Sequence, residues 1–384
     1  MLEGGRISEA ELVTMLMYTV LGTAYFSLPA VASSFTGHDA WLVPIMATLP
    51  GFLVAGITGY LAVHFPGFNF FNWTEIILGR TGGKILQFFY VLFFIHVTAI
   101  IISEFNYFLN IAFMPMTPSL VFSTLLLFLT GVAVYGGIEM IGRLATVFLP
   151  VSVVISTGMI ILAAGLYHFA NLMPFLDRGV APVLAGSISL SGLRTEIFLG
   201  AMFFPFLKRP DQGGWVQFRA NLWIGFLLLL ISLSVALAFG DEGARLSLPV
   251  YSLVREISLM HFFEHLESLA LILWISGIFM KVAVWEYVTI LGTAQWLNLK
   301  SYRPLVLPMG LLLAALANYD MPNGAVLSHF AASVIPFEVM LFAIVLPGIL
   351  AVLSLFRTRP ASHWAKRKGL PANEKKAMRD PQPT

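Results

Sequence analysis

Apolar segments long enough to cross a membrane recur along almost the whole chain. A membrane-spanning helix needs about 20 largely apolar residues, and roughly ten such segments precede a polar tail. Their expected bounds are 8–31, 40–64, 83–111, 117–136, 143–167, 184–206, 217–240, 266–298, 303–319 and 328–356. Only 11% of the residues are charged, against about 25% in soluble domains. The sequence therefore predicts an all-α polytopic membrane protein with ten transmembrane helices.

The basic residues predict how the chain lies in the membrane. Most Lys and Arg residues fall in the tail and in alternate connections, and short connections rich in Lys and Arg stay in the cytoplasm. Both termini are therefore expected inside. The predicted domains are a transmembrane domain over 1–360 and a basic cytoplasmic tail over 361–384. The longer connections 65–82 and 241–265 are each expected to hold a short helix.

Two expected spans carry glycine and hydroxyl residues at mid-membrane depth. One contains Gly22, Thr23 and Ala24, and the other contains Ser191 and Gly192. Glycine costs a helix about 1 kcal/mol relative to alanine, so both spans are expected to unwind there. Freed amides and carbonyls could bind the carboxylate and ammonium of an amino acid. The alternative is ordinary close packing of helices through small residues.

These two spans occupy matched positions in the chain. One opens the first half, about 8–167, and the other opens the second half, about 184–356. Interrupted helices at corresponding positions of two halves are typical of inverted-repeat transporters. The sequence thus predicts a five-plus-five inverted repeat with discontinuous helices 1 and 6.

Six ionisable residues fall inside or near the expected spans, where a charge without a partner costs about 3 kcal/mol. They are Glu104, Arg194, Glu196, Lys281, Glu286 and Glu338. Arg194 and Glu196 are two residues apart, so an intact helix points them toward different partners. Glu104 is a candidate partner for Arg194. Arg194 is expected either to contact a ligand or to clamp loosened backbone carbonyls.

Lys281 shares one stripe of its expected helix with Trp274 and Trp285. Its ammonium could lie over a tryptophan ring, or pair with a nearby glutamate for packing alone. A third interpretation is that it reaches the interrupted first span, near Ala24 to Ser27, and stands where a transporter of this kind would bind a sodium ion.

These arguments select a candidate ligand site between expected spans 1, 3, 6 and 8. Glu104 and Lys281 are its candidates for coupling to ions or protons. The expected ligand-binding residues are Gly22, Thr23, Ala24, Tyr107, Ser191, Gly192, Arg194, Glu196 and Trp285.

Several other site chemistries are not supported. The chain has no cysteine, which removes disulfides and cysteine-bound metals. The stretch 79–84 lacks the first Gly and the Ser or Thr of a phosphate-binding loop, and His261, Glu264 and His265 do not follow the HExxH order. We expect no enzyme, no cofactor and no metal site. The net charge of +2 gives no reason to expect a nucleic-acid partner.

Short stretches in a fixed order carry a resemblance to a known family. They include Leu21-Gly22-Thr23 with Leu28-Pro29, Phe65-Pro66-Gly67, Ile77-Leu78-Gly79, Gly142-Arg143, Thr195-Glu196 and Trp274. In these stretches the chain resembles the spore germination permease family, the B subunits of nutrient germinant receptors within the amino acid–polyamine–organocation superfamily. One position departs from the pattern, because Thr195 stands where the family often has Gly.

The resemblance implies a function as well as a fold. It implies a subunit of the spore inner membrane, a bacterial cell membrane, that assembles with A-type and C-type receptor subunits. It also implies that a small nutrient, an amino acid, binds in the central cavity and triggers germination. A proton-coupled amino acid permease and a structural membrane scaffold are the alternative interpretations.

Overall fold

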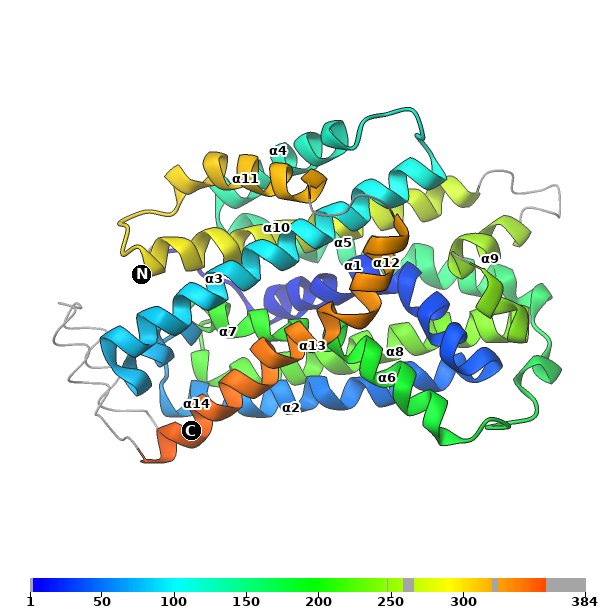
Figure 1. Ribbon diagram of the computed structural model, residues 1–384, viewed down its shortest axis with the longest axis horizontal. Coiled ribbons are helices and arrows are strands. Elements are labelled where there is room, and N and C mark those ends of the chain that lie inside the picture. The colour runs from blue at the N-terminus through cyan, green and yellow to red at the C-terminus, as the bar shows by residue number, and fades with distance from the viewer. Residues whose placement is uncertain (1–2, 247, 258–265, 320–323, 357–384) are drawn as a thin grey trace.

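The computed structural model describes residues 3–246, 248–257, 266–319 and 324–356. Within these ranges the chain is almost entirely helical (Figure 1). The α-helices are α1 (Glu9–Thr36), α2 (Val43–His64), α3 (Phe70–Ala112), α4 (Ser119–Gly136), α5 (Ile138–Leu162), α6 (Val180–Thr195), α7 (Gly200–Phe203), α8 (Gly213–Phe239), α9 (Pro249–Ile257), α10 (Leu266–Trp296), α11 (Val306–Tyr319), α12 (Gly324–Ser333), α13 (Ile335–Met340) and α14 (Leu346–Phe356).

The apolar character of these helices makes the protein membrane-spanning. In the described part of the chain, seven helical stretches are long and apolar enough to cross a membrane. The stretch Arg303–Tyr319 is a shorter apolar helix. An all-helical membrane protein is therefore confirmed, and the count of ten crossings stays a prediction. The tail 361–384 lies outside the described residues, as do His261, Glu264 and His265.

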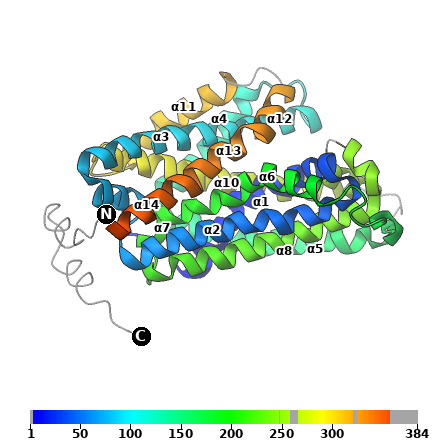
Figure 2. The same ribbon diagram turned by 60° about the horizontal axis from the view of Figure 1, so that its bottom comes forward.

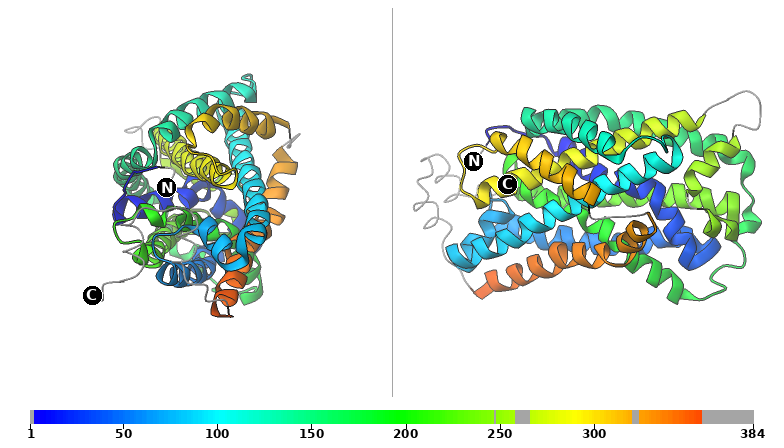
Figure 3. Two further views of the ribbon diagram at one scale, coloured as in Figure 1. Left: turned by 90° about the vertical axis from the view of Figure 1, so that its left-hand side faces the viewer. Right: turned by 45° about the horizontal axis from the view of Figure 1, so that its top comes forward.

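Helices α1 and α10 form the centre of the bundle. They pack against each other, and α1 also packs against α5, α6 and α8. In the end-on view of Figure 3, the blue α1 and the yellow α10 lie inside the ring made by the other helices. Figure 2 shows α2 and α8 side by side on one flank, where they pack together. Every residue of α10 from Met280 to Ala294 is buried, so this helix is the place where a charge most needs a partner.

Local sequence signals explain how two of the helices begin and bend. Ser8 and Glu11 form a capping box at the start of α1, each bonding the other's backbone N–H. In α3, Gly79 has φ of 82° and splits a first helical piece, 70–78, from the long remainder. The short helix expected in 65–82 is thus present. Helix α9 lies within 241–265, where the second short helix is expected.

The expected interruption of the first span is wrong. Helix α1 runs without a break through Gly22. A β-carbon at Gly22 would lie 2.7 Å from the carbonyl oxygen of Gly277 and 2.8 Å from Cβ of Lys281. The glycine therefore lets α1 and α10 approach closely, which is the small-residue packing alternative. No backbone groups are freed at this position to hold a ligand.

The sixth span changes from α-helix to a 3₁₀ turn four residues after Gly192. Helix α6 continues through Gly192, and a 3₁₀ turn follows at Glu196–Leu199. A β-carbon at Gly192 would meet Cα of Pro336 at 2.3 Å, so this glycine too serves helix packing. The span changes helical type after Thr195 without unwinding at Gly192, so the break predicted at that glycine is wrong.

The last expected span, 328–356, is interrupted, which the sequence analysis missed. It is divided into α12, α13 and α14, with a π-helical stretch at Leu341–Val345. Pro336 follows the first break at Val334, and a proline lacks the N–H that would continue the preceding helix.

Candidate functional site

The centre of the bundle holds a buried ion pair between Lys281 and Glu196. The ammonium nitrogen Nζ of Lys281 lies 2.9 Å from Oε1 and 2.8 Å from Oε2 of Glu196. It also donates to Oγ1 of Thr23 at 2.9 Å. Trp285 Nε1 donates to Oε2 of Glu196 at 3.1 Å. We call these four residues the Lys281 cluster.

Three helical segments position this cluster. Lys281 and Trp285 are four residues apart on α10, so their side chains share one face. Thr23 is brought within reach by the close approach of α1 at Gly22. Glu196 is the first residue of the 3₁₀ turn after α6. A 3₁₀ turn has fewer residues per turn than an α-helix, so the side chain of Glu196 points in a different direction from the one a continued α-helix would give it.

The cluster is enclosed by the protein. Lys281 has no exposed surface, and Glu196, Thr23 and Trp285 are all buried. Phe93 and Phe94 of α3 pack their rings against Trp285 at centroid distances of 6.0 and 6.3 Å. In such surroundings each charge depends on the other, because removing one partner leaves an uncompensated buried charge.

A second carboxyl group lies in the field of this pair. Glu104 of α3 interacts electrostatically with both Lys281 and Glu196. The expectation that Glu104 pairs with Arg194 is wrong, because among the described residues Arg194 has other partners. Glu104 and Lys281, the two residues that the sequence analysis selected for ion or proton coupling, therefore interact with each other.

Arg194 points away from the Lys281 cluster, toward α2 and α8. Its Nη2 donates to Oγ1 of Thr48 at 3.0 Å and to the carbonyl oxygen of Asn221 at 2.7 Å. The side chain is fully buried. The contact with a backbone carbonyl agrees with the clamp interpretation in part, because that carbonyl belongs to the intact helix α8 and not to loosened backbone. The two-residue spacing from Glu196 correctly indicated separate partners.

Gly22 packs against the stem of Lys281, but in the described residues no hydrogen bond or ion pair joins the other expected binding residues to the cluster. The Ser191 hydroxyl donates to the carbonyl of Ser187 in its own helix at 2.6 Å. Ala24 is buried in α1, and Tyr107 of α3 is half-buried and packs against the hydrophobic core. Gly22 and Gly192 pack helices together, as described above. Their part in ligand binding stays a prediction.

A small cavity lies on another side of α1 from the cluster. It has a volume of about 40 Å³ and lies between α1, α5, α8 and α10. Its lining includes Tyr18, Gly22, Tyr25, Trp274 and Gly277. The expected ligand site lies between spans 1, 3, 6 and 8, which are α1, α3, α6 and α10 in the structure. The cavity shares α1 and α10 with this site, but it is lined by α5 and α8 in place of α3 and α6.

Two buried features were missed by the sequence analysis. Glu286, although noted as a membrane charge, accepts a hydrogen bond from Thr130 of α4 at 2.6 Å, and its other oxygen has no hydrogen-bond partner in the described residues. Asn221 of α8 donates to the carbonyl of Thr48 at 2.9 Å. Thr130 directly follows the apolar run 125–129, which is a signal that would have found it, whereas Asn221 stands near Gln217 and Arg219 and has no such signal.

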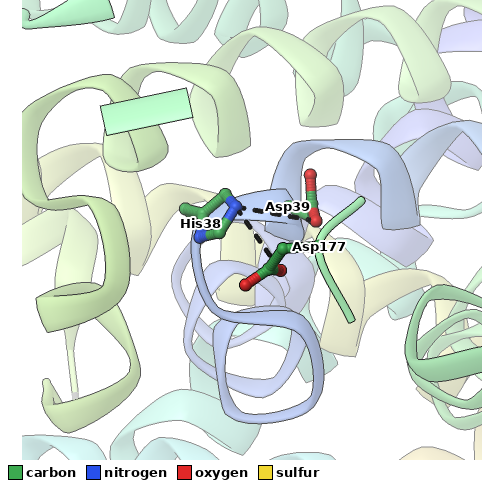
Figure 4. A group of neighbouring side chains, drawn as sticks. All are labelled: His38, Asp39 and Asp177. Carbon is green, nitrogen blue, oxygen red and sulfur yellow. Dashed lines mark ion pairs between the residues drawn. The ribbon is translucent and has the colours of Figure 1, made fainter. Parts of the chain in front are cut away.

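A second group of charged residues lies where three connections meet at one end of the bundle. His38 follows α1, Asp177 precedes α6, and Asp241 follows α8. Figure 4 shows His38, Asp39 and Asp177 converging, with ion-pair distances of 3.8 Å from His38 Nε2 to each aspartate. We call His38, Asp39, Asp177 and Asp241 the His38 cluster.

The charge of His38 depends on opposing effects. Burial alone would lower its pKa, but the carbonyl of Pro174 and the carboxylate of Asp241 outweigh this and raise the pKa above 6.5. For Asp241, burial would raise the pKa, but hydrogen bonds from His38 and the charge of Arg178 lower it below 3.8. The cluster therefore favours a positive charge at its centre.

Comparison with known proteins identifies relatives along most of the chain. Residues 6–324 match the sequence model of a family described as spore germination protein. Spore germination protein KB of Bacillus subtilis (strain 168) is 24% identical over 368 residues, covering 93% of this chain and 97% of that protein. Spore germination protein YndE of the same strain is 23% identical over 367 residues, covering 92% and 98%.

The fold is similar to that of a transporter of known structure. Mhp1, a nucleobase-cation-symport-1 family transporter solved in a closed conformation with bromovinylhydantoin bound, superimposes with a TM-score of 0.58 at 12% identity. The alignment covers 93% of this chain and 80% of Mhp1. The similarity at this identity concerns the fold, which agrees with the helical bundle around α1 and α10. On the extent of the family match, the chain belongs to the spore germination protein family.

Proposed function

We propose that this protein is the membrane subunit of a spore germinant receptor and that it binds an amino acid at the Lys281 cluster. The observation that carries the proposal is the buried ion pair that joins α1, the turn after α6, and α10. In transporters with inverted repeats, the ligand site lies near mid-membrane between the repeats, and the Lys281 cluster joins helices from both halves of this chain. Membership in the germination family supplies the biological context.

The charges of the pair favour a zwitterionic ligand. A ligand carboxylate can replace Glu196 as the partner of Lys281, while the ligand ammonium takes Glu196. Both buried charges then keep a counter-charge throughout the exchange. A ligand with one charge leaves either Lys281 or Glu196 without a partner, which costs about 3–5 kcal/mol for a buried pair.

The pair also supports a function without sodium. The Lys281 ammonium lies between α1 and α10, where it already supplies a positive charge to Glu196 and to the hydroxyl of Thr23. A sodium ion at the same place would add a charge next to the ammonium. The response to the nutrient is therefore expected to be the same in sodium and potassium buffers.

Binding by the purified chain in detergent tests the proposal. Amino acids are screened by their effect on thermal unfolding, and the best ligand is compared with its methyl ester and with its decarboxylated amine. We expect both analogues to bind at least about tenfold more weakly, since each removes one charge. Lys281→Met should abolish binding, whereas Lys300→Met, at an exposed lysine beyond α10, should not. Equal binding of the free amino acid and its ester would contradict the proposed exchange.

Selectivity among nutrients is expected to depend on the uncharged members of the cluster. Thr23→Val removes an acceptor of the Lys281 ammonium, and Trp285→Phe removes a donor to Glu196. Both changes should alter which amino acid triggers germination at unchanged protein level. Ser191→Ala is a useful comparison, because the Ser191 hydroxyl is satisfied within its own helix. A change in expression alone would assign these residues to packing.

A proton-coupled amino acid permease is the second candidate function. The observation that favours it is Glu104, a second carboxyl group in the field of the Lys281–Glu196 pair, because chains of carboxyl groups are typical of proton relays in transporters. Uptake of a labelled amino acid into liposomes by the purified chain, driven by a pH gradient, supports this function. Ligand binding without uptake supports the receptor subunit.

The membrane arrangement belongs to the same proposal. It comprises ten crossings in two repeats of five, both termini in the cytoplasm, and assembly with A-type and C-type subunits in the spore inner membrane. Because the chain has no cysteine, single cysteines report topology directly. Ser301→Cys should react with an impermeant maleimide from the cytoplasmic side and Glu242→Cys from the opposite side. Co-purification of the A-type and C-type subunits from spore membranes tests the assembly.

A further inference from the structure

The His38 cluster brings several hydrogen-bond acceptors, which are also potential metal ligands, to one point. Nδ1 of His38 lies 3.0 Å from Oδ1 of Asp241, which also accepts the His38 backbone N–H at 3.0 Å. The other ring nitrogen, Nε2, lies 2.8 Å from the carbonyl oxygen of Pro174 and 3.8 Å from a carboxylate oxygen of both Asp39 and Asp177. Three oxygens therefore face Nε2, and each of them is an acceptor.

The carboxylate of Asp241 determines which form of the imidazole faces these oxygens. A carboxylate accepts the proton of Nδ1, and in the neutral ring this leaves Nε2 with a free lone pair. Metal-binding histidines in proteins usually donate their second ring N–H to a carboxylate or carbonyl in the same manner. The arrangement is thus that of a histidine oriented by its carboxylate, with Nε2 aimed at two further carboxylates as Figure 4 shows.

The charges of the cluster do not balance without a cation. Three aspartates surround His38, and the nearest counter-charge is Arg178, 3.7 Å from Asp241. With a neutral imidazole, Arg178 compensates one of the three aspartates, and two negative charges remain uncompensated. A proton on Nε2 removes one of them, and a divalent cation removes both. His38 and Asp39 are 3% and 2% exposed, so solvent screens the charge of Asp39 poorly, whereas Asp177 and Asp241 are 35% and 58% exposed and are screened better.

Among the residues that the structure describes, neighbouring charged side chains do not supply the missing charge. Glu242, next to Asp241, pairs with Arg245 at 3.0 Å. The Asp39 carboxylate accepts the backbone N–H of Leu176 at 3.1 Å, a neutral donor that leaves its charge in place.

We propose that His38, Asp39 and Asp177 bind a divalent transition-metal cation, with the carbonyl oxygen of Pro174 as a further ligand. One ligand atom from each of the three side chains lies within 4.8 Å of the other two. Zinc forms tetrahedral sites with bonds of about 2.0–2.2 Å to nitrogen and oxygen, so two ligands of one ion lie about 3.3–3.6 Å apart. The contacts of Nε2 at 2.8 Å and 3.8 Å lie on either side of this separation.

The ligand set indicates which cations fit. Imidazole favours zinc and its neighbours over calcium and magnesium, which prefer oxygen ligands alone, and carboxylates with a carbonyl also suit manganese. Zn²⁺ and Mn²⁺ are therefore the ions to test. The residues come from positions 38–39 and 177, which are far apart in the chain, so no local sequence motif predicts the site.

The cation would hold three connections together. It would join the turn after α1 to the segment before α6 and, through Asp241, to the turn after α8. Helix α1 carries Thr23 and α6 leads to Glu196, so both helices that meet at Lys281 are fixed at this end. The proposal does not depend on the identity of any nutrient.

Metal binding to the full-length protein in detergent tests the proposal. The protein is freed of metal with a chelator, and binding of Mn²⁺ is followed by the loss of the free-ion electron paramagnetic resonance signal, with Zn²⁺ as competitor. We expect one competing site per chain. Asp177→Asn is the first variant, because the Asp177 side chain is 35% exposed and its replacement leaves the buried residues in place.

Matched variants separate the cluster from its surroundings. We expect binding to weaken at least about tenfold in Asp177→Asn and in His38→Gln, and about 10–100-fold in Asp241→Asn, which acts as a positioning residue. Glu242→Gln, on the same turn as Asp241, and His64→Gln, at the end of α2, should bind as the unmodified protein does. The proposal is wrong if the unmodified protein binds neither ion, in which case a proton on Nε2 is the positive charge, or if Asp177→Asn binds equally well.

Discussion

Two buried cations of this protein, Lys281 and Arg194, are held in opposite ways. Lys281 faces a carboxylate, with both oxygens of Glu196 within 2.9 Å. Arg194 faces a hydroxyl and a backbone carbonyl, and its Nε and Nη1 have no hydrogen-bond partner in the described part of the chain. Both side chains are fully buried. Burial alone therefore does not identify a ligand site.

The difference lies in what each cation leaves behind when it is removed. Without Lys281, the Glu196 carboxylate is buried next to an indole N–H and has no counter-charge. Without Arg194, the Thr48 hydroxyl still donates to the carbonyl of Pro44 at 2.6 Å, and the Asn221 carbonyl stays within helix α8. A charge that its partner depends on can be exchanged for a ligand charge, whereas the hydrogen bonds of Arg194 connect α6 to α2 and α8.

The largest effect is expected from Lys281→Met. Removing one partner of a buried ion pair costs about 3–5 kcal/mol, so thermal unfolding in detergent should shift strongly downward and the nutrient response should be lost. Adding Glu196→Gln in the same chain removes the orphaned charge and should restore most of the stability without restoring the response. Lys281→Arg should impair the response, because a planar guanidinium cannot reproduce the compact ammonium.

Stability and response are measured separately for these variants, by unfolding in detergent and by germination of spores. Lys300→Met is the matched control and should change neither. A fully responsive Lys281→Met variant would contradict the proposed site and leave Lys281 as a residue that only stabilises the bundle.

A smaller effect is expected where α1 approaches α10. In Gly22→Ala the new methyl group would lie 2.7 Å from the carbonyl oxygen of Gly277, and backbone cannot move aside as a flexible side chain does. Overpacking of this kind costs about 1–3 kcal/mol, and it moves Thr23 away from Lys281. We expect lower thermal stability together with a weaker nutrient response.

Gly158→Ala is the control for this substitution. Gly158 lies within α5, and a β-carbon there meets no atom within 4 Å. The change should stabilise the protein by up to about 1 kcal/mol through helix propensity. Equal behaviour of the two alanine variants would show that the contact between α1 and α10 does not determine the geometry of the cluster.

Patterns repeated along the chain predicted the fold class better than single residues predicted the site. The apolar segments and the scarcity of charge indicated a helical membrane protein, and the order of short motifs indicated the family. Glycine was ambiguous, because it can mark either an unwound helix or a close helix contact. Gly22 and Gly192 both belong to the second case, and only contacts between distant segments distinguish the two.

Individual charged residues could be selected from the sequence, but their pairing could not. The cost of burying a charge correctly selected Lys281, Glu196 and Arg194 as residues that need partners. Glu196 lies 85 residues from Lys281, and no local pattern spans that distance. The His38 cluster was missed for the same reason, since its residues follow or precede different helices.

The smallest effect is expected from Arg194→Met, which completes the comparison. Methionine keeps a long, unbranched and flexible stem, so it can fill the space between α2, α6 and α8. The two hydrogen bonds of Nη2 are lost, each worth about 1 kcal/mol, but the desolvation of a guanidinium without a carboxylate partner is lost with them. The free energy of unfolding should change by less than about 1 kcal/mol, measured by denaturation in detergent, and the choice of nutrient should be unchanged. If Arg194→Met instead changes which amino acid acts while leaving stability intact, Arg194 contacts the ligand and the site extends from the Lys281 cluster toward α2 and α8.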